Sequence, residues 1–561
     1  MEYAKTIEMT DRPWLKNYPE GVPANIDLNE FDTVNSFLSD SVQKFSKLAA
    51  FQNFGKSITY KKLDQLSDQF AGFLQSSGLK PGDKLALMMP NLLQYPIALF
   101  GALKAGIIVV NTNPLYTPRE MQHQFLDAEV SAVLIAENFA YNLEKIADKV
   151  NLKLIITTSV GELLGFVKGK MINGVIKYIK RGVPRYNLPN AIKFSEALKT
   201  GRKAKLTLHE GQADDVIMLQ YTGGTTGVSK GAMLTNKNLI VNMLMMKAWM
   251  KKDLIEGKEV TLSPLPMYHI FAFSVNCLAM MSFGAETVLV TNPRDLNSVI
   301  KEFKRNNITL MSGVNTLFNA LNGQKAFQDL DFSNLKIVVA GGMALQQSVA
   351  QEWEGITGVK VAEGYGMTEA SPVVTINPLN GNARTGYIGM PVPSTDVRIV
   401  NDDGEVLGFD EVGEIQVKGP QVMKGYYKRP DETANTIISD GWLCTGDMAF
   451  INNDGYLKIV DRKKDMILVS GFNVFPNEIE ETVALHPKVM EVAAVGVPDE
   501  KSGEIVKIFV VKKDKSLNKE ELIAHCRENL TGYKVPKQVE FKDELPKSNV
   551  GKILRRKLRD S

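Results

Sequence analysis

Hydrophobic periodicity alternates between helix and strand over the first two thirds of the chain. Leu63, Leu66, Phe70 and Leu74 recur at helical spacing in residues 60–76, and Gly78 follows as a helix stop. A second helix is expected at 97–105. Buried strands are predicted at 84–89, 107–110, 132–136, 152–157, 216–220, 336–340 and 359–362. Helices that alternate with buried strands predict α/β layers on largely parallel sheets.

The pattern changes near residue 384. Short strands at 396–400 and 413–418, separated by Gly and Asp turns, predict a β-rich subdomain. Beyond the charged stretch 461–465, strands at 491–497 and 505–512 flank a helix at 518–529. We therefore expect a large N-terminal domain of layered α/β parts plus a β-rich subdomain, followed by a small α+β C-terminal domain.

Composition narrows the class of protein. The 561 residues favour several domains, and 66 Lys+Arg against 63 Asp+Glu leave a net charge of +3, which gives no support for nucleic-acid binding. The three cysteines, Cys277, Cys444 and Cys526, are too scattered for a disulfide scaffold or a CxxC metal site and fit a reducing cytosol.

Membrane insertion is not expected from the hydropathy pattern. The N-terminus lacks the apolar region of a secretory signal. The longest uncharged apolar stretch, 270–285, contains Ser274 and Asn276 and is shorter than the roughly 20 residues of a spanning helix. We interpret this stretch as buried core, and we expect a cytoplasmic protein.

A glycine- and threonine-rich loop follows the expected strand at 216–220. Residues 221–231 read YTGGTTGVSKG, with four glycines and three threonines. Convergent backbone N–H groups and hydroxyls hold anions without bulk, and a lysine adds positive charge. The loop predicts a polyphosphate site formed by Thr222, Gly223, Gly224, Thr225, Thr226, Gly227 and Lys230.

The loop has two other interpretations. The Walker-type pattern G-x-x-x-x-G-K-[ST] fails, because the lysine precedes the last glycine. Residues 227–231 match G-x-S-x-G, the nucleophile elbow of serine hydrolases, with Ser229 as the nucleophile. An elbow places its serine directly on a strand-to-helix turn, whereas here a further Gly-Thr stretch separates the strand from Ser229.

Further motifs follow the loop in a fixed order. They are PLPMYH at 264–269, GGMAL at 341–345, GYGMTE at 364–369, GWLCTGD at 441–447, DRKKD at 461–465, GFNVFPNE at 471–478 and PKSNVGK at 546–552. Together they resemble the acyl-adenylate-forming superfamily, and the resemblance covers nearly the whole chain. Residues 440–480 resemble the signature of fatty acyl-CoA synthetases, above all of bacterial long-chain fatty acid–CoA ligases.

The resemblance implies a reaction in two halves and two domains. A fatty carboxylate attacks the α-phosphorus of MgATP to give acyl-AMP and pyrophosphate, and the thiol of coenzyme A then releases AMP. A carboxylate with a pKa of about 4.3 is already ionised, so the first half needs positioning and charge neutralisation but no general base. The implied domains are residues 1–462, which bind AMP and fatty acid, and a mobile cap, 463–561.

The resemblance also assigns roles to residues. Thr225, Thr226 and Lys230 would hold the β- and γ-phosphates, and Glu369 with Thr225 would bind Mg²⁺. The nucleotide would contact Gly342, Gly364, Tyr365, Gly366, Thr368, Asp447 and Arg462, with Tyr365 against adenine and Asp447 on the ribose. Taken alone, Glu369 fits a helix cap, Tyr365 a core residue, and Asp447 with Arg462 a structural ion pair.

Four further positions have implied roles in catalysis or in binding the acyl group and coenzyme A. Lys552 would bridge the carboxylate and the α-phosphate, although a solvated basic tail is the simpler interpretation of 547–559. Lys464 would be the hinge between half-reactions, and Gly471 would line the pantetheine tunnel after rotation. His269 would lie near the reacting carboxylate without acting as acid or base.

Two segments suit a lipid substrate. The methionine-rich stretch 243–250, with Trp249 as a gate, would line an acyl tunnel; ordinary helix core explains it equally well. Residues 163–186 combine apolar side chains with six Lys or Arg and no acid, which is typical of contact with an anionic membrane at its inner face. An amphipathic helix packed on its own domain is the alternative.

The leading hypothesis is a long-chain fatty acid–CoA ligase that uses ATP, coenzyme A and Mg²⁺. Medium-chain or aryl-acid ligases, and a ligase that stops at acyl-AMP, share its chemistry. A fatty-acid binding or uptake protein is the alternative from another class, and intact Lys552, Glu369 and Asp447 argue against it. A peptide-synthetase module is disfavoured, since no carrier domain follows Lys552. The oligomeric state stays open, a homodimer included.

Overall fold

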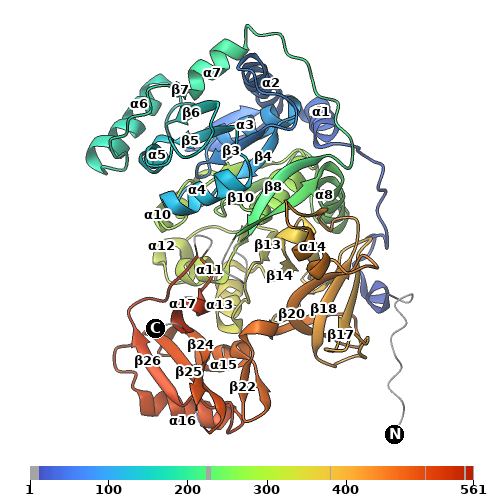
Figure 1. Ribbon diagram of the computed structural model, residues 1–561. Coiled ribbons are helices and arrows are strands. Elements are labelled where there is room, and N and C mark those ends of the chain that lie inside the picture. Colours follow the sequence, from blue (N-terminus) through green and yellow to red (C-terminus); the bar gives the residue numbers. More distant parts are fainter. Residues whose placement is uncertain (1–11, 223–228, 380, 500, 549–550, 560–561) are drawn as a thin grey trace.

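The computed structural model describes residues 12–222, 229–379, 381–499, 501–548 and 551–559 (Figure 1). Parallel strands form the centre of the first sheet of the N-terminal domain. Its order is β19 (Gly425–Tyr426), β9 (Lys230–Thr235), β8 (Val216–Thr222), β4 (Ile108–Asn111), β3 (Lys84–Met88), β5 (Ala132–Ala136), β6 (Leu154–Thr158) and β7 (Ile192–Lys193). The strands predicted at 84–89, 107–110, 132–136, 152–157 and 216–220 are confirmed within two residues at each end, with β8 continuing to Thr222.

A second sheet lies beside the first. Its order is β16 (Met390–Pro391), β15 (Val373–Ile376), β14 (Val361–Gly366), β13 (Ile337–Ala340), β12 (Leu310–Gly313), β10 (Val260–Ser263), β11 (Glu286–Leu289), β1 (Ala49–Asn53) and β2 (Lys56–Thr59). Strands β10 to β14 pair in parallel, while β2 and β15 run antiparallel to their neighbours. The predicted parallel sheets are therefore confirmed.

Helices cover both sheets. They are α1 (Val34–Phe45), α2 (Tyr60–Ser76), α3 (Gln94–Lys104), α4 (Pro118–Asp127), α5 (Ala140–Glu144), α6 (Phe166–Gly174), α7 (Phe194–Gly201), α8 (Asn236–Met250), α9 (Ile270–Ala272), α10 (Leu296–Arg305), α11 (Asn315–Asn322), α12 (Lys325–Gln328) and α13 (Gln347–Thr357). Helix α2 matches its predicted bounds, and α3 begins three residues earlier than predicted. The apolar stretch 270–285 forms α9 and a buried π-helical segment, Phe273–Ala279, as expected of core.

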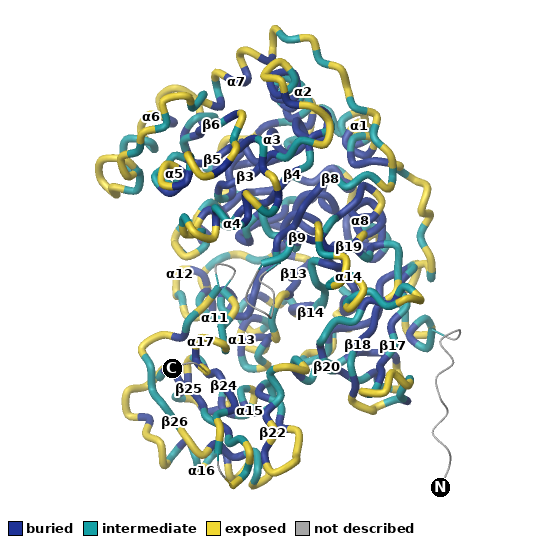
Figure 2. Tube along the Cα trace, viewed as in Figure 1, coloured by how far each residue is buried: buried dark blue, intermediate teal, exposed yellow. Residues whose placement is uncertain are grey.

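The central strands are buried on both faces. In β3, Leu85 and Leu87 pack into the core shared with α2 and α3, whereas Ala86 and Met88 pack into a second cluster with α4 and α5. Alternate side chains of a strand point to opposite faces, so a strand covered on both sides must be apolar at every position. This explains why the strands here read as continuous apolar runs. Figure 2 shows the same buried layer in dark blue.

The β-rich subdomain forms as predicted. Its sheet runs in the order β17 (Asp396–Val400), β18 (Gly413–Lys418), β20 (Leu443–Ile451) and β21 (Leu457–Arg462), all antiparallel. Helix α14 (Pro430–Thr436) lies in its connections. The strands β17 and β18 match their predicted bounds.

The C-terminal domain has its own sheet and core (Figure 1). Its strands are β22 (Ile467–Val469), β23 (Phe472–Val474), β24 (Val489–Asp499), β25 (Gly503–Lys512) and β26 (Gln538–Lys542), with α15 (Pro476–Ala484), α16 (Lys519–Asn529) and α17 (Arg555–Arg559). Leu545 and Leu558 pack on the opposite face of β24 and β25, which fixes the C-terminal tail to this domain. The core of the β-rich subdomain ends near Ile459 and this core begins at Ile467; the division at 462/463 stays a prediction.

Candidate functional site

A cavity of about 670 Å³ opens where the carboxyl ends of β10, β12, β13 and β14 meet the C-terminal domain. In α/β sheets the carboxyl ends of parallel strands are the usual place for a ligand. Residues of the glycine-rich loop and of six of the seven further motifs line the cavity, all but the motif at 471–478. The predicted site residues among them are Thr222, Lys230, Trp249, His269, Gly342, Gly364, Tyr365, Gly366, Thr368, Glu369, Arg462, Lys464 and Lys552.

The glycine-rich loop connects two paired strands. Thr222 at the end of β8 pairs with Lys230 at the start of β9, so the base of the loop is fixed. Gly223, Gly224, Thr225, Thr226 and Gly227 lie outside the described residues. Because β9 follows Ser229, the strand-to-helix turn of a nucleophile elbow is not formed, and the serine hydrolase interpretation is wrong on geometry.

Lys230 lines the cavity and contacts a distant segment of the chain. It is the first residue of β9, and its ammonium forms an ion pair with Glu432 on α14 and lies 5.1 Å from the centre of the Tyr426 ring. The Tyr426 hydroxyl in turn donates to the Glu369 carboxylate at 2.7 Å. Sequence reasoning missed Glu432 and Tyr426, because no motif marks them and the contacts span about 60 to 200 residues of chain.

Tyr365, Asp447 and Arg462 form one polar group. The Tyr365 hydroxyl donates to Asp447 at 2.6 Å, and the Arg462 guanidinium lies 3.0 Å from the other carboxylate oxygen. Burial, followed by the charge of Asp447, raises the pKa of Tyr365 well above its usual range, so the phenol stays protonated and keeps donating. The three motifs that supplied these residues therefore converge.

Backbone geometry also explains why glycine occupies some positions in this region. Gly342 has φ +81, which favours glycine, and a Cβ on Gly366 would collide with the carbonyl of Pro372. An added Cβ on Gly364 would lie 3.3 Å from the carbonyl oxygen of Thr375, a tight contact but a milder one than at Gly366. The close pairing of β14 with β15 thus explains Gly366 without a ligand.

Lys552 reaches into the cavity from the C-terminal domain. It follows Gly551, whose carbonyl accepts a hydrogen bond from Thr316 of α11 at 3.4 Å. Its side chain lines the cavity and stays exposed to solvent there, while partial desolvation by the surrounding protein, followed by the charge of Arg462, lowers the pKa of its ammonium to about 8. Lys552 therefore lines the cavity, and its role in adenylation stays a prediction.

His269 caps α9, with its ring nitrogen Nδ1 accepting from the Phe271 N–H at 3.4 Å. Burial and the positive charge of Lys552 lower the pKa of His269 to about 4, so the ring is neutral at physiological pH. That state fits the expectation that His269 is not a general acid or base.

The end of the cavity next to α8 is apolar. Helix α8 is capped by Thr235 and buries the methionine-rich stretch in the main core. Met246, Trp249 and Met250 also line the cavity, with Val275 and Ile376. The Trp249 indole N–H donates to the carbonyl of Asn377 at 3.1 Å, which fixes the ring at the wall. This stretch is therefore helix core in part and cavity wall in part, and the acyl tunnel stays a prediction.

Lys464 and Gly471, the two residues predicted to take part in a domain rotation, lie in different places relative to the cavity. Lys464 lies in a short helical turn directly after Arg462 and lines the cavity; burial lowers the pKa of its ammonium. Gly471 sits away from the cavity on the turn between β22 and β23, with φ +84 and open space around an added Cβ. In this orientation of the C-terminal domain, Gly471 is a turn glycine.

Comparisons with known proteins agree with this geometry. The AMP-binding enzyme model matches residues 38–427, and the AMP-binding enzyme C-terminal domain model matches 478–552. The chain belongs to the AMP-binding enzyme family. It is 53% identical over 551 residues to a long-chain-fatty-acid–CoA ligase of Yersinia pestis, with 98% of each chain covered, and equally so over 548 residues to that of Salmonella typhimurium.

Solved structures show the same fold. The ATP-bound MatB of Rhodopseudomonas palustris superposes with a TM-score of 0.82 at 27% identity, over 94% of this chain and 99% of that one. The predicted adenylate-forming fold, with its separate C-terminal domain, is thereby confirmed.

Proposed function

We propose that this protein activates long-chain fatty acids with ATP and coenzyme A through an acyl-AMP intermediate. One observation carries the proposal. A single cavity joins a cationic and carboxylate end, at Lys230 and Glu369, to a polar centre at Tyr365, Arg462 and Lys552 and to an apolar end at α8. Charged and apolar substrates that must react together need such a continuous site.

In the first half-reaction, a carboxylate oxygen of the fatty acid attacks the α-phosphorus of ATP, and pyrophosphate leaves. The Lys552 ammonium neutralises charge between the carboxylate and the α-phosphate, and Lys230 holds the leaving phosphates after exchanging Glu432 for them. Asp447, oriented by Tyr365 and Arg462, accepts from the ribose hydroxyls. Neutral His269 adds no charge beside the carboxylate.

Mg²⁺ fits the cationic and carboxylate end. Glu369 offers a hard carboxylate oxygen, its other oxygen being held by Tyr426, and Mg²⁺ in nucleotide sites takes one or two carboxylates together with phosphate oxygens. Thr225, the second predicted ligand, lies outside the described residues. When bound, the ion supplies charge neutralisation on the phosphates.

In the second half-reaction, the coenzyme A thiol attacks the acyl carbon and AMP leaves with one of the former carboxylate oxygens. Lys552 fills the cavity in the orientation described here, so we propose that the C-terminal domain rotates about Lys464 and brings Gly471 to the thiol's path.

Product analysis tests the function. Purified protein is supplied with ATP, Mg²⁺ and carboxylic acids of increasing chain length, with and without coenzyme A. We expect AMP, pyrophosphate and acyl-CoA, most efficiently with long chains. A preference for aryl acids, or release of ADP and phosphate, would contradict the proposal.

Adenylation should weaken in alkaline solution because Lys552 must carry a proton. With a pKa lowered to about 8, the ammonium persists below that value and is lost above it. We expect kcat/KM for ATP in pyrophosphate release to fall about tenfold per pH unit above roughly pH 8. A Lys552→Arg variant, slower but permanently charged, should lack this fall. An identical fall in both proteins would assign the titration to another group.

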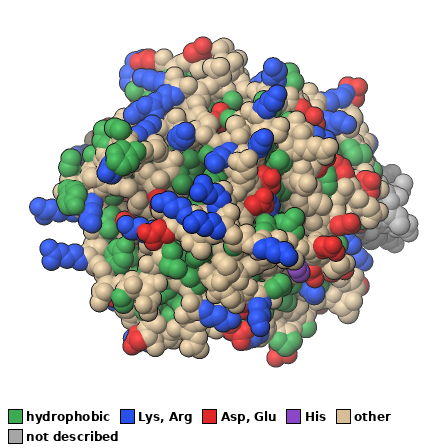
Figure 3. All heavy atoms as spheres, turned by 90° about the horizontal axis from the view of Figure 1, so that it is seen from above, with side chains coloured by type: hydrophobic (Ala, Val, Ile, Leu, Met, Phe, Trp, Pro, Cys, Tyr) green, Lys and Arg blue, Asp and Glu red, His purple; other side chains and the backbone are tan. Residues whose placement is uncertain are grey.

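We also propose that residues 163–186 contact an anionic membrane surface, where a fatty acid would be collected. None of the described helices is long and apolar enough to cross a bilayer. Large apolar side chains of this segment are nevertheless exposed: Phe166 (75%), Val167 (79%), Met171 (62%), Tyr178 (75%) and Ile179 (75%). Figure 3 shows hydrophobic and basic side chains together at the left edge, where α6 lies in Figure 1.

The geometry of α6 supports a surface role over packing on its own domain. One face is anchored, because Gly169 abuts Gly161 and Asn173 accepts from the Gly161 N–H at 2.7 Å. The other face presents Phe166 with Lys170 one turn later, the ammonium lying 3.9 Å from the ring centre. Apolar and basic groups on one exposed face suit the boundary of an anionic bilayer.

Charge reversal tests the contact. Each basic residue near an anionic bilayer contributes about 1 kcal/mol, so replacing Lys177, Lys180 and Arg181 by glutamate should weaken binding to phosphatidylglycerol-containing vesicles at least about 100-fold. Vesicle co-sedimentation measures it. The matched control reverses Lys513, Lys515 and Lys519, exposed residues of the C-terminal domain, and should bind normally. Equal binding by both triple variants would rule out this segment as the contact.

A further inference from the structure

Asp461 carries an ion pair that crosses the proposed pivot at Lys464. Asp461 lies in β21, before the pivot, and is only 1% exposed. One of its carboxylate oxygens accepts from Arg555 at 2.9 Å, and the other accepts from the backbone N–H of Asn477 at 2.7 Å. Arg555 and Asn477 both belong to the C-terminal domain. The carboxylate therefore links the two domains at their junction.

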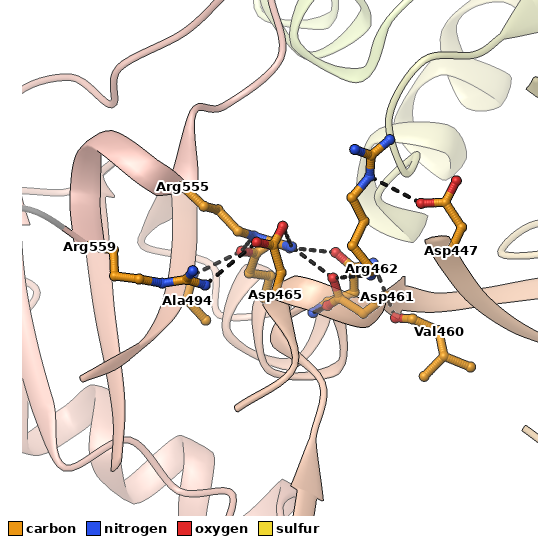
Figure 4. A network of polar contacts seen from close by, with 10 residues as sticks. Asp447, Val460, Asp461, Arg462, Asp465, Ala494, Arg555 and Arg559 are labelled. Atoms are coloured by element: carbon orange, nitrogen blue, oxygen red, sulfur yellow. Dashed lines mark hydrogen bonds and ion pairs between the residues drawn. The ribbon is translucent and has the colours of Figure 1, made fainter. Parts of the chain in front are cut away.

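Arg555 is held equally well on the far side of the pivot. Its guanidinium donates twice to the carboxylate of Glu480, at 2.9 and 2.7 Å, and once to the Asn477 side chain at 2.5 Å. Figure 4 shows the guanidinium between Asp465 and Asp461, while Arg462 points the other way to Asp447. Glu480 and Asn477 move with Arg555 in any rotation about Lys464, whereas Asp461 does not.

A rotation therefore separates a defined set of bonds. It breaks the contacts of Asp461 with Arg555 and Asn477, together with the bond from the Asn477 amide to the carbonyl of Val460 at 3.1 Å. The bonds between Arg555 and Glu480 remain. A buried carboxylate that loses its charged partner is costly, so the junction favours the orientation in which these bonds are made.

We propose that Arg555 is a positioning residue for adenylation, which clamps the C-terminal domain to Asp461 and so keeps Lys552, three residues earlier, in the cavity. The clamp rests on the proposed two-step function, because it sets how often the domain stands in the orientation for the first step. A stronger clamp favours the orientation for acyl-AMP formation, and a weaker one favours the orientation for thioester formation.

A pair of isosteric variants separates this role from general stability. Asp461→Asn removes the carboxylate charge across the pivot, and Glu480→Gln removes the one that moves with Arg555. Acyl-AMP formation and thioester formation from supplied acyl-AMP are measured for both. We expect Asp461→Asn to lower the ratio of the first rate to the second at least about tenfold, and Glu480→Gln to leave the ratio near that of the unmodified protein.

A measurement of the distance between the two domains, made without substrate, tests the clamp independently of the reaction rates. Spin labels at the exposed Lys325 and Lys515, in a Cys444→Ser background, report the separation of the domains. Asp461→Asn should populate a second distance that Glu480→Gln does not. If Asp461→Asn fails to fold, Arg555→Lys replaces it, because lysine keeps the charge but cannot span the three partners. The clamp would be overturned if Asp461→Asn left the rate ratio unchanged and showed a single interdomain distance, or if Asp461→Asn and Glu480→Gln changed both readouts equally. If the unmodified protein formed no acyl-AMP, the proposed function itself would be refuted.

Discussion

Replacing Lys552 by alanine will lower acyl-AMP formation by about 10²–10³-fold, the size of effect expected when one preorganised charge at the reacting centre is removed. Lys552 is a cation that the C-terminal domain adds to the cavity, and its ammonium lies close enough to shift the pKa of His269. Pyrophosphate release in the presence of fatty acid measures the loss.

The same variant should largely retain thioester formation from supplied acyl-AMP, because that step needs Lys552 to leave the cavity. Lys547→Ala is the matched control: this lysine of the same tail pairs with Glu491 on the C-terminal domain instead of lining the cavity. Normal pyrophosphate release by Lys552→Ala would reject the assignment.

Replacing Lys464 by proline will impair thioester formation far more than adenylation, by about 10-fold or more if rotation limits the second step. Lys464 lies in a short helical turn, and proline fixes φ near −65°, which such a turn accommodates. The orientation with Lys552 in the cavity is thus kept, while the φ change that a rotation needs is blocked. Lys463→Pro is the neighbouring control.

The two half-reactions are assayed separately, as for Lys552. Equal loss of both rates in Lys464→Pro would count against a hinge at this residue. An equal effect of Lys463→Pro would show that the turn as a whole, and not Lys464, is the pivot.

The sequence predicted the central strands of the first sheet well, because each is buried on both faces. The strands β10, β11 and β12 of the second sheet were not predicted, although they too are largely buried. Strands such as β3 and β5 alternate between two apolar layers, so their residues read as unbroken apolar runs that few other structures tolerate. Strand β9 was missed. Its residues, Lys230–Thr235, begin inside the glycine-rich sequence 221–231, and pairing with β8 and β19 makes them a strand.

The site residues that belong to sequence motifs could be predicted, whereas the residues that contact them from distant segments could not. Tyr365, Asp447, Arg462 and Lys552 converge as the resemblance implied, since each motif fixes its own backbone. Glu432, Tyr426 and the clamp of Arg555 with Asp461 depend on contacts between distant segments, and a charged residue on a tail or a turn carries no local signal of its partner.

The central claim, that a carboxylate is activated as acyl-AMP in this cavity, is tested most directly by following its oxygens. A long-chain fatty acid labelled with ¹⁸O at both carboxylate oxygens is converted with ATP and coenzyme A, and the products are analysed by mass spectrometry. Attack on the α-phosphorus followed by thiolysis predicts one labelled oxygen in AMP and one in the acyl-CoA carbonyl. Label in pyrophosphate or phosphate, with none in AMP, would contradict the account.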